Sequence, residues 1–214
     1  MITRILIVIN VIVFLWEVGT GALTSDSALL AHGALTPYSV LHDHQYWRIV
    51  TGAFLHASIL HIGVNMLSLW FLGRFIEEVL GSPRMLLVYV VSMIVSGLGV
   101  VYFSAPYIPT IGASGAIFGL FGALFAIGFK FGRRGMELVK ANLGILILNL
   151  VLTFSIPEIS KAAHVAGLLS GFVLTFAIYF PPKPVRAHVI DANTGERFES
   201  QLETPGDARR QQYP

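Results

Sequence analysis

The chain has 214 residues, of which 55% are hydrophobic and only 12% are charged. Soluble domains carry about 25% charged residues, and a water-soluble core of this size would not hide so much apolar side-chain surface. We therefore expect lipid to be the solvent for most of the chain. The formal net charge is only +2 and the basic residues form no dense patch, which argues against nucleic-acid binding. The sequence contains no cysteine, which excludes disulfides, thiolate metal sites and cysteine nucleophiles.

Six apolar runs approach the length of about 20 residues that a membrane-spanning helix needs. The first run lacks a strong basic n-region, contains Asn10 and Glu17, and has no convincing small-residue cleavage site beside it, so we interpret it as a retained span and not as a signal peptide. We predict an all-α polytopic membrane protein with a six-span domain over residues 1–180. The predicted spans are roughly Ile2–Val18, His61–Val79, Met85–Phe103, Ile111–Phe129, Leu138–Phe154 and Ala162–Phe180.

Two long segments lie outside the predicted spans. Residues 19–60 form an outer connection that is apolar in patches and carries Tyr46 and Trp47, residues that favour the membrane–water boundary. We expect this connection to lie in or on the outer leaflet. Residues 181–214 form a polar cytoplasmic tail, in which Asn193-Thr194-Gly195 indicates the turn of a small hairpin. We assign no chemistry to the tail.

The distribution of basic residues predicts the orientation of the chain in the membrane. With the N-terminus inside, all Lys and Arg residues fall on the cytoplasmic side except Arg48 and Lys161. Both termini are therefore expected in the cytoplasm. The sequence shows no organelle-targeting presequence, which favours a bacterial plasma membrane.

Polar residues inside spans are the first candidates for chemistry, because each is costly in lipid. No Asp lies in a predicted span, which removes a paired-aspartate protease, and no HExxH zinc motif occurs. Spans two, four and six enter from the outer face, and each carries polar residues in its opening turns. A rise of about 1.5 Å per residue puts these side chains at similar depth: His61, Asn65, Ser114 and His164.

Spacing along the helices gives these residues a reason to meet. His61 and Asn65 are four residues apart and share a helix face. Glycine stripes allow two helix backbones to approach closely, and here they would bring Ser114 within hydrogen-bond distance of His164, as a serine nucleophile and its base require. The stripes consist of Gly112, Gly115, Gly119 and Gly122 on span four, and of Gly167 and Gly171 on span six.

Each of these residues also has an alternative interpretation. A serine among glycines is commonly a packing residue, an intramembrane histidine can relay protons or bind a ligand, and Asn65 can simply join two helices. A transporter pathway predicts polar groups through both leaflets, whereas the inner halves of spans four and six are apolar. A metal site would have to use histidines that lack a recognised ligand spacing: His42, His44, His56 and His61.

Four motifs in chain order resemble those of the rhomboid family of intramembrane serine proteases, over about residues 46–172. The family's second-span signature is matched by Trp47-Arg48, Phe54-Leu55-His56 and His61-x-x-x-Asn65, with Gly73-Arg74 and Glu77 at the charged end of that span. Its GxSG nucleophile motif is matched by Gly112-Ala113-Ser114-Gly115. Its sixth-span motif is matched by Ala163-His164-x-x-Gly167-x-x-x-Gly171.

The resemblance implies a six-span rhomboid-like bundle with a membrane-associated outer loop after the first span. It implies that Ser114 and His164 form a catalytic dyad near the outer face, and that the transmembrane segments of single-span proteins are its substrates. The oxyanion would be stabilised by the side chains of Asn65 and His61 and by the backbone N–H of Ser114. Supporting positions would be Gly112, Gly115, Phe118, Gly167 and Gly171.

The resemblance also leaves departures and alternatives. Phe118 stands where the family often has a tyrosine, so the ring is kept and the hydroxyl is lost. The spans offer no acidic third member, so His164 would be oriented by packing. Residues 154–161 would form a mobile cap, and substrates would enter laterally past span five. An inactive rhomboid-like protein would lack the serine or the histidine. No cofactor, metal or nucleic-acid partner is expected, and the sequence does not indicate an oligomeric state.

Overall fold

The computed structural model describes residues 1–157, 159–181, 185–190 and 197–202, and the chain divides into two compact units, Met1–Tyr179 and Phe180–Pro214. In the second unit β1 (Val185–Ile190) pairs with β2 (Arg197–Leu202) as an antiparallel hairpin. The pairing runs from Val185 opposite Leu202 to Ile190 opposite Arg197. The predicted Asn193-Thr194-Gly195 turn lies outside the described residues.

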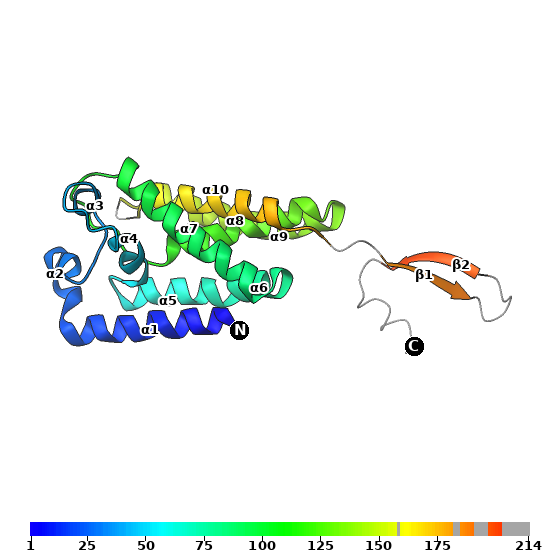
Figure 1. Ribbon diagram of the computed structural model, residues 1–214, viewed down its shortest axis with the longest axis horizontal. Coiled ribbons are helices and arrows are strands. Elements are labelled where there is room, and N and C mark those ends of the chain that lie inside the picture. The colour runs from blue at the N-terminus through cyan, green and yellow to red at the C-terminus, as the bar shows by residue number, and fades with distance from the viewer. Residues whose placement is uncertain (158, 182–184, 191–196, 203–214) are drawn as a thin grey trace. The chain divides into compact units, whose positions relative to one another are not determined.

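The first unit is a bundle of long helices with a cluster of short helices at one end (Figure 1). The long helices are α1 (Ile2–Thr20), a continuous helix made of α5 (Ile59–Ser68), the π-helical segment η3 (Leu69–Gly73) and α6 (Arg74–Leu80), then α7 (Ser82–Phe103), α8 (Ser114–Lys130), α9 (Arg133–Ser155) and α10 (Lys161–Ile178). The short helices are η1 (Ala22–Thr24), α2 (Asp26–Ala31), α3 (Pro37–Leu41), α4 (Arg48–Thr51) and η2 (Gly52–Phe54).

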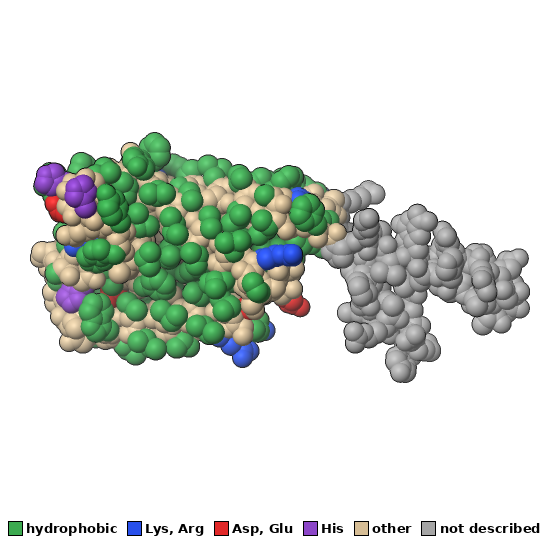
Figure 2. All heavy atoms as spheres, viewed as in Figure 1, with side chains coloured by type: hydrophobic (Ala, Val, Ile, Leu, Met, Phe, Trp, Pro, Cys, Tyr) green, Lys and Arg blue, Asp and Glu red, His purple; other side chains and the backbone are tan. Residues whose placement is uncertain are grey.

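The surface of the helical unit is that of an integral membrane protein. In the part of the chain that the structure describes, five helices are long and apolar enough to cross a membrane: Ile2–Thr20, Ile59–Leu80, Ser82–Phe103, Gly135–Ser155 and Lys161–Ile178. Figure 2 shows hydrophobic side chains over most of the visible face of this unit, with histidines gathered at the end where α2 and α3 lie. The fourth predicted span corresponds to α8, which is apolar but has only 17 residues. A total of six spans stays a prediction.

Helix α8 forms the centre of the bundle. Every residue from Gly115 to Gly128 is buried, and α7, α9 and α10 all pack against it. A helix that is apolar on all sides is buried by neighbouring helices on every face. This packing fixes the position of Ser114, the first residue of α8.

The backbones of α8 and α10 touch at their glycines, as the glycine stripes predicted. A Cβ atom added to Gly167 would lie 2.0 Å from the carbonyl oxygen of Gly115, and one added to Gly171 would lie 1.9 Å from that of Gly119. No side chain fits at either position. On the neighbouring face, the buried side chains of Ser96 and Ser92 on α7 lie against Gly115 and Gly119 in the same way.

The connection between α1 and α5 is held by side chains that bond to the backbone. Ser25, Thr36 and Ser58 cap the helices that follow them. Arg48 donates hydrogen bonds to the carbonyl oxygens of Leu30 and Ala34, both at 2.7 Å. The short helices therefore form an ordered platform beside the long ones.

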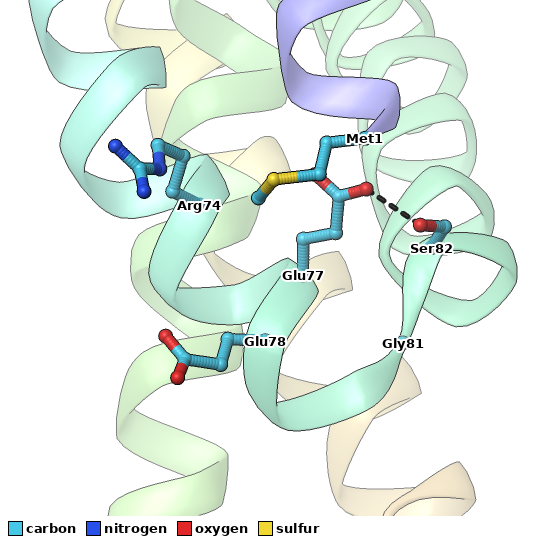
Figure 3. Close-up of a pocket in the computed structure, with 6 residues that line it drawn as sticks. All are labelled: Met1, Arg74, Glu77, Glu78, Gly81 and Ser82. Carbon is cyan, nitrogen blue, oxygen red and sulfur yellow. Dashed lines mark hydrogen bonds between the residues drawn. The ribbon is translucent and has the colours of Figure 1, made fainter.

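At the opposite end of the bundle, a buried carboxylate joins three helices. Glu77 on α6 accepts hydrogen bonds from the backbone N–H groups of Ile2 and Thr3, from the Thr3 hydroxyl, and from the Ser82 hydroxyl. Because the first N–H groups of a helix lack partners within it, the carboxylate fixes the start of α1 against α6 and α7. Figure 3 shows the bond between Ser82 and Glu77 beside a pocket of about 450 Å³.

Candidate active site

A cavity of about 680 Å³ lies in the half of the helical unit where the short helices sit. All four predicted polar residues line it, although they come from three helices: His61, Asn65, Ser114 and His164. Much of the remaining wall is apolar, from residues such as Met93 and Phe121. The arrangement is a small polar site in an apolar pocket, as in most ligand sites.

The serine sits at the start of α8, directly after a tight turn. Gly112 has φ +111°, a conformation that favours glycine, and its N–H donates to the carbonyl oxygen of Gly52 at 2.9 Å. The glycine stripe predicted that Gly112 lies within the fourth span, on the same side of the helix as Gly115. That was wrong, because its positive φ cannot belong to a right-handed helix, and α8 begins only at Ser114.

The imidazole of His164 faces the serine from the first turn of α10. Its Nε2 atom lies 2.8 Å from the Ser114 hydroxyl oxygen. The ring of Phe118 stacks on the imidazole with centroids 4.0 Å apart and an interplanar angle of 16°. His164 is only 7% exposed, so packing restricts its ring to one orientation.

His164 makes a third contact, which the sequence did not predict. The hydroxyl oxygen of Thr153 on α9 lies 2.7 Å from Nδ1 of His164. A lone threonine in an apolar helix commonly bonds to its own backbone, so the sequence carries no signal for this contact. The expectation that packing alone orients His164 is therefore incomplete.

Two further donors point toward the start of α8. His61 accepts a hydrogen bond from the N–H of Ala57 on Nδ1, which leaves Nε2 of the neutral ring as a donor. A Cβ atom added to Gly112 would lie 2.8 Å from this Nε2 and 3.6 Å from Nδ2 of Asn65. Nδ2 of Asn65 is buried and has no hydrogen-bond partner among the described residues. A buried donor without a partner costs free energy, which indicates that a bound ligand accepts its hydrogen bond.

His56, which belongs to the second-span signature, is fully buried beside the site. Its backbone N–H donates to both carboxylate oxygens of Glu17 at 3.1 Å, and its ring meets that of His61 edge-on at 5.0 Å. Burial lowers the pKa of His56 to about 4, so this ring is neutral near pH 7. The sequence did not predict this contact, through which Glu17 joins α1 to His56, 39 residues later in the chain.

Four other polar residues of the predicted spans bond within their own helices. Asn10, Asn142 and Asn149 each donate to the carbonyl oxygen four residues earlier in their own helix, and Ser170 donates to Gly167. Among the described residues, no three His, Asp or Glu side chains converge as metal ligands.

The fold and the site together define a class: a polytopic helical membrane protein with a serine–histidine pair that lines a largely apolar cavity. The family model of the rhomboid domain matches residues 43–180, well over half of the chain. The chain belongs to the rhomboid family.

Curated relatives agree with this assignment. The chain is similar to Rhomboid protease GluP of Bacillus subtilis (strain 168), with 36% identity over 169 residues, covering 78% of this chain and 32% of that protein. It is 36% identical over 166 residues to RHOMBOID-like protein 2 of Arabidopsis thaliana, covering 74% of this chain and 50% of that protein. Putative rhomboid protease YdcA of Bacillus subtilis (strain 168) is 35% identical over 159 residues, covering 72% of this chain and 79% of that protein. The chain thus spans half or less of the first two relatives.

Proposed function

We propose that this protein is an intramembrane serine endopeptidase that cleaves transmembrane segments of single-span membrane proteins. The observation that carries the proposal is the 2.8 Å contact between the hydroxyl oxygen of Ser114 and Nε2 of His164 inside the cavity. Relatives whose names include the words rhomboid protease support it. The distance falls in the range that links a serine nucleophile to its general base.

In the proposed reaction, Ser114 attacks the carbonyl carbon of the scissile peptide while its proton passes to Nε2 of His164. The imidazolium then gives this proton to the leaving amine. Water entering the cavity attacks the acyl-enzyme with His164 again as base, which releases the second product and restores the serine hydroxyl. All atoms are supplied by the substrate, one water molecule and these two side chains.

The negative charge on the tetrahedral intermediate needs donors aimed at it. We assign this role to Nδ2 of Asn65, Nε2–H of His61 and the backbone N–H of Ser114. The first is supported by its lack of a partner, the second by the hydrogen bond that Nδ1 accepts from Ala57, and the third by the position of Ser114 at the start of α8, where N–H groups are free. One such donor is worth roughly 10²–10³ in rate.

The surroundings of the cavity support the proposed substrate route. Ile156 and Ile159, from the segment between α9 and α10, contribute to its lining together with Leu152 of α9. We propose that residues 154–161 form a cap over the site, residue 158 lying outside the described residues. Substrates would enter beside α9, and because a membrane helix hides its peptide bonds, the cleaved segment must unwind first.

A cleavage assay tests the function. Protein purified in detergent is incubated with a model single-span substrate and, separately, with a fluorophosphonate probe that labels active serines. We expect cleavage and labelling by the parent, loss of both in Ser114→Ala, and loss of cleavage in His164→Ala. Ser68→Ala, which changes another serine lining the cavity, should keep both activities. Cleavage by Ser114→Ala at the parent rate contradicts the assignment.

We also propose that both termini face the cytoplasm of a bacterial cell and that the cavity opens toward the outer face. The excess of Lys and Arg on one side supports this orientation. Because the chain contains no cysteine, single cysteines can be introduced without a background. Glu78→Cys should resist a membrane-impermeant thiol reagent in intact cells, and Asp43→Cys should react. The reverse pattern overturns the orientation.

A further inference from the structure

Thr153 stands out on its helix because it is buried where its neighbours are exposed. Only 17% of the Gly135–Ser155 span is buried, the lowest share of the five candidate spans, yet Thr153 is 1% exposed. Its hydroxyl oxygen lies 2.7 Å from Nδ1 of His164 and 2.7 Å from the carbonyl oxygen of Asn149. The hydroxyl thus connects the imidazole to the backbone of α9.

These two contacts determine which nitrogen of the imidazole carries the proton. A threonine hydroxyl has one proton to donate and lone pairs with which to accept, whereas a carbonyl oxygen can only accept. Both contacts are hydrogen bonds at once only if the hydroxyl donates to Asn149 and Nδ1–H of His164 donates to the hydroxyl. A neutral imidazole has one N–H, so Nε2 is left unprotonated, facing the Ser114 hydroxyl at 2.8 Å.

The opposite tautomer would be unproductive. If Nε2 carried the proton, it would donate to Ser114 and could not remove the serine proton. Thr153 would then have to give its single proton to Nδ1 and leave Asn149 without the contact. The observed distances therefore select the tautomer that a general base requires.

We propose that Thr153 is a positioning residue that holds His164 in the Nδ1–H tautomer, with Nε2 free to accept the proton of Ser114. This inference rests on the proposed function. In the acylation step the serine proton moves to Nε2, and Nδ1–H stays bonded to Thr153. The threonine neither gains nor loses a proton over the cycle. Among the described residues no carboxylate bonds to His164, and Thr153 occupies the position beside Nδ1 where a third, acidic member would lie.

Three substitutions separate this role from simple packing. Thr153→Val keeps the shape and removes the hydroxyl, and Thr153→Ser restores the hydroxyl. Thr175→Val is the matched control, because Thr175 on α10 is fully buried and its hydroxyl has no partner among the described residues. We expect Thr153→Val to lower kcat about tenfold with little change in KM, the scale of one neutral hydrogen bond. Thr153→Ser should recover most of the loss, and Thr175→Val should cleave at the parent rate.

A spectroscopic readout tests the tautomer without relying on activity. Long-range ¹H–¹⁵N spectra of protein labelled at histidine nitrogens, recorded at pH 8 with His164→Ala for assignment, report which nitrogen is protonated. We expect an unprotonated Nε2 in the parent and in Thr153→Ser, and a mixture of tautomers in Thr153→Val. An unprotonated Nδ1 in the parent overturns the inference even if Thr153→Val fails to fold.

The same experiments distinguish the inference from the proposed function. Full kcat in Thr153→Val, or equal loss in Thr153→Val and Thr153→Ser, overturns the positioning role while leaving the protease intact. A parent protein without cleavage or probe labelling, but with the tautomer changing in Thr153→Val, supports the positioning of His164 and contradicts the proposed function.

Discussion

Adding one methyl group at Gly167 should disable the site without touching either member of the proposed dyad. A Cβ atom there would lie 2.0 Å from the carbonyl oxygen of Gly115, whereas ordinary contact begins at about 3.4 Å. Helix α10 must therefore retreat from α8 by about 1.4 Å. Because His164 lies one turn away on the same helix, the 2.8 Å contact to Ser114 would lengthen to about 4.2 Å, beyond hydrogen-bond range.

A misplacement of about 1 Å costs on the order of 10²-fold in rate. We therefore expect Gly167→Ala to reduce substrate cleavage and fluorophosphonate labelling by at least that factor. Overpacking of this kind costs about 1–3 kcal/mol, so the thermal unfolding temperature in detergent should also fall.

The matched control is Gly144→Ala on α9, where an added Cβ would meet nothing within 4 Å. This variant should label and unfold like the parent protein. Parent-like labelling of Gly167→Ala, with an unchanged unfolding temperature, would refute the argument that glycine contact between α8 and α10 sets the distance between serine and histidine.

Three further predictions concern other parts of the helical unit. Asn65→Ala should lower kcat by a factor of roughly 10²–10³. The control Asn142→Ala should keep the parent rate, because the Asn142 amide bonds within its own helix. Equal rates for the two variants would contradict the role of Asn65 in stabilising the oxyanion. Glu77→Gln should lower the free energy of unfolding by about 2 kcal/mol because buried bonds to the carboxylate are weakened, and in thermal unfolding the exposed Glu78→Gln should match the parent. Burial lowers the pKa of His56 to about 4 in the folded protein, whereas a histidine in the unfolded chain has a pKa near 6.5. As the pH falls, the unfolded chain therefore binds this proton first. The contribution of neutral His56 to the free energy of unfolding is complete above pH 6.5 and is lost as the pH falls toward 4. Unfolding measured across this range should be less pH-dependent in His56→Gln, and an unchanged slope would exclude His56 as the cause.

The sequence was sufficient for the parts of the fold that depend on periodicity and composition. The apolar runs correspond to the long helices, with ends within a few residues, because lipid imposes both length and apolarity on a span. The glycine stripes predicted the contact of α8 and α10, since no side chain separates the two backbones. The approach of Ser114 to His164 followed from that contact.

What the sequence did not show depends on local geometry. At Gly112 the chain forms a turn with a positive φ where a helix was predicted. The periodicity of apolar residues carries no information on single dihedral angles. Thr153 reaches His164 only because of the rotation of α9 about its own axis, which spacing alone does not determine. Glu17 meets the backbone of His56 through a path over 39 residues, a long-range contact without a local sequence pattern.

The short length of α8 has a consequence for the depth in the bilayer at which the proposed cleavage would occur. Seventeen residues at about 1.5 Å per residue extend about 25 Å, less than the roughly 30 Å of a typical hydrocarbon layer. Since α8 is enclosed by its neighbours, we expect the outer helices, and not α8, to adjust to differences in bilayer thickness. The depth of the serine is then a property of the protein. If the protein cleaves transmembrane segments as proposed, a thicker bilayer would place the serine further below the membrane surface, and the cleaved bond would shift along the substrate.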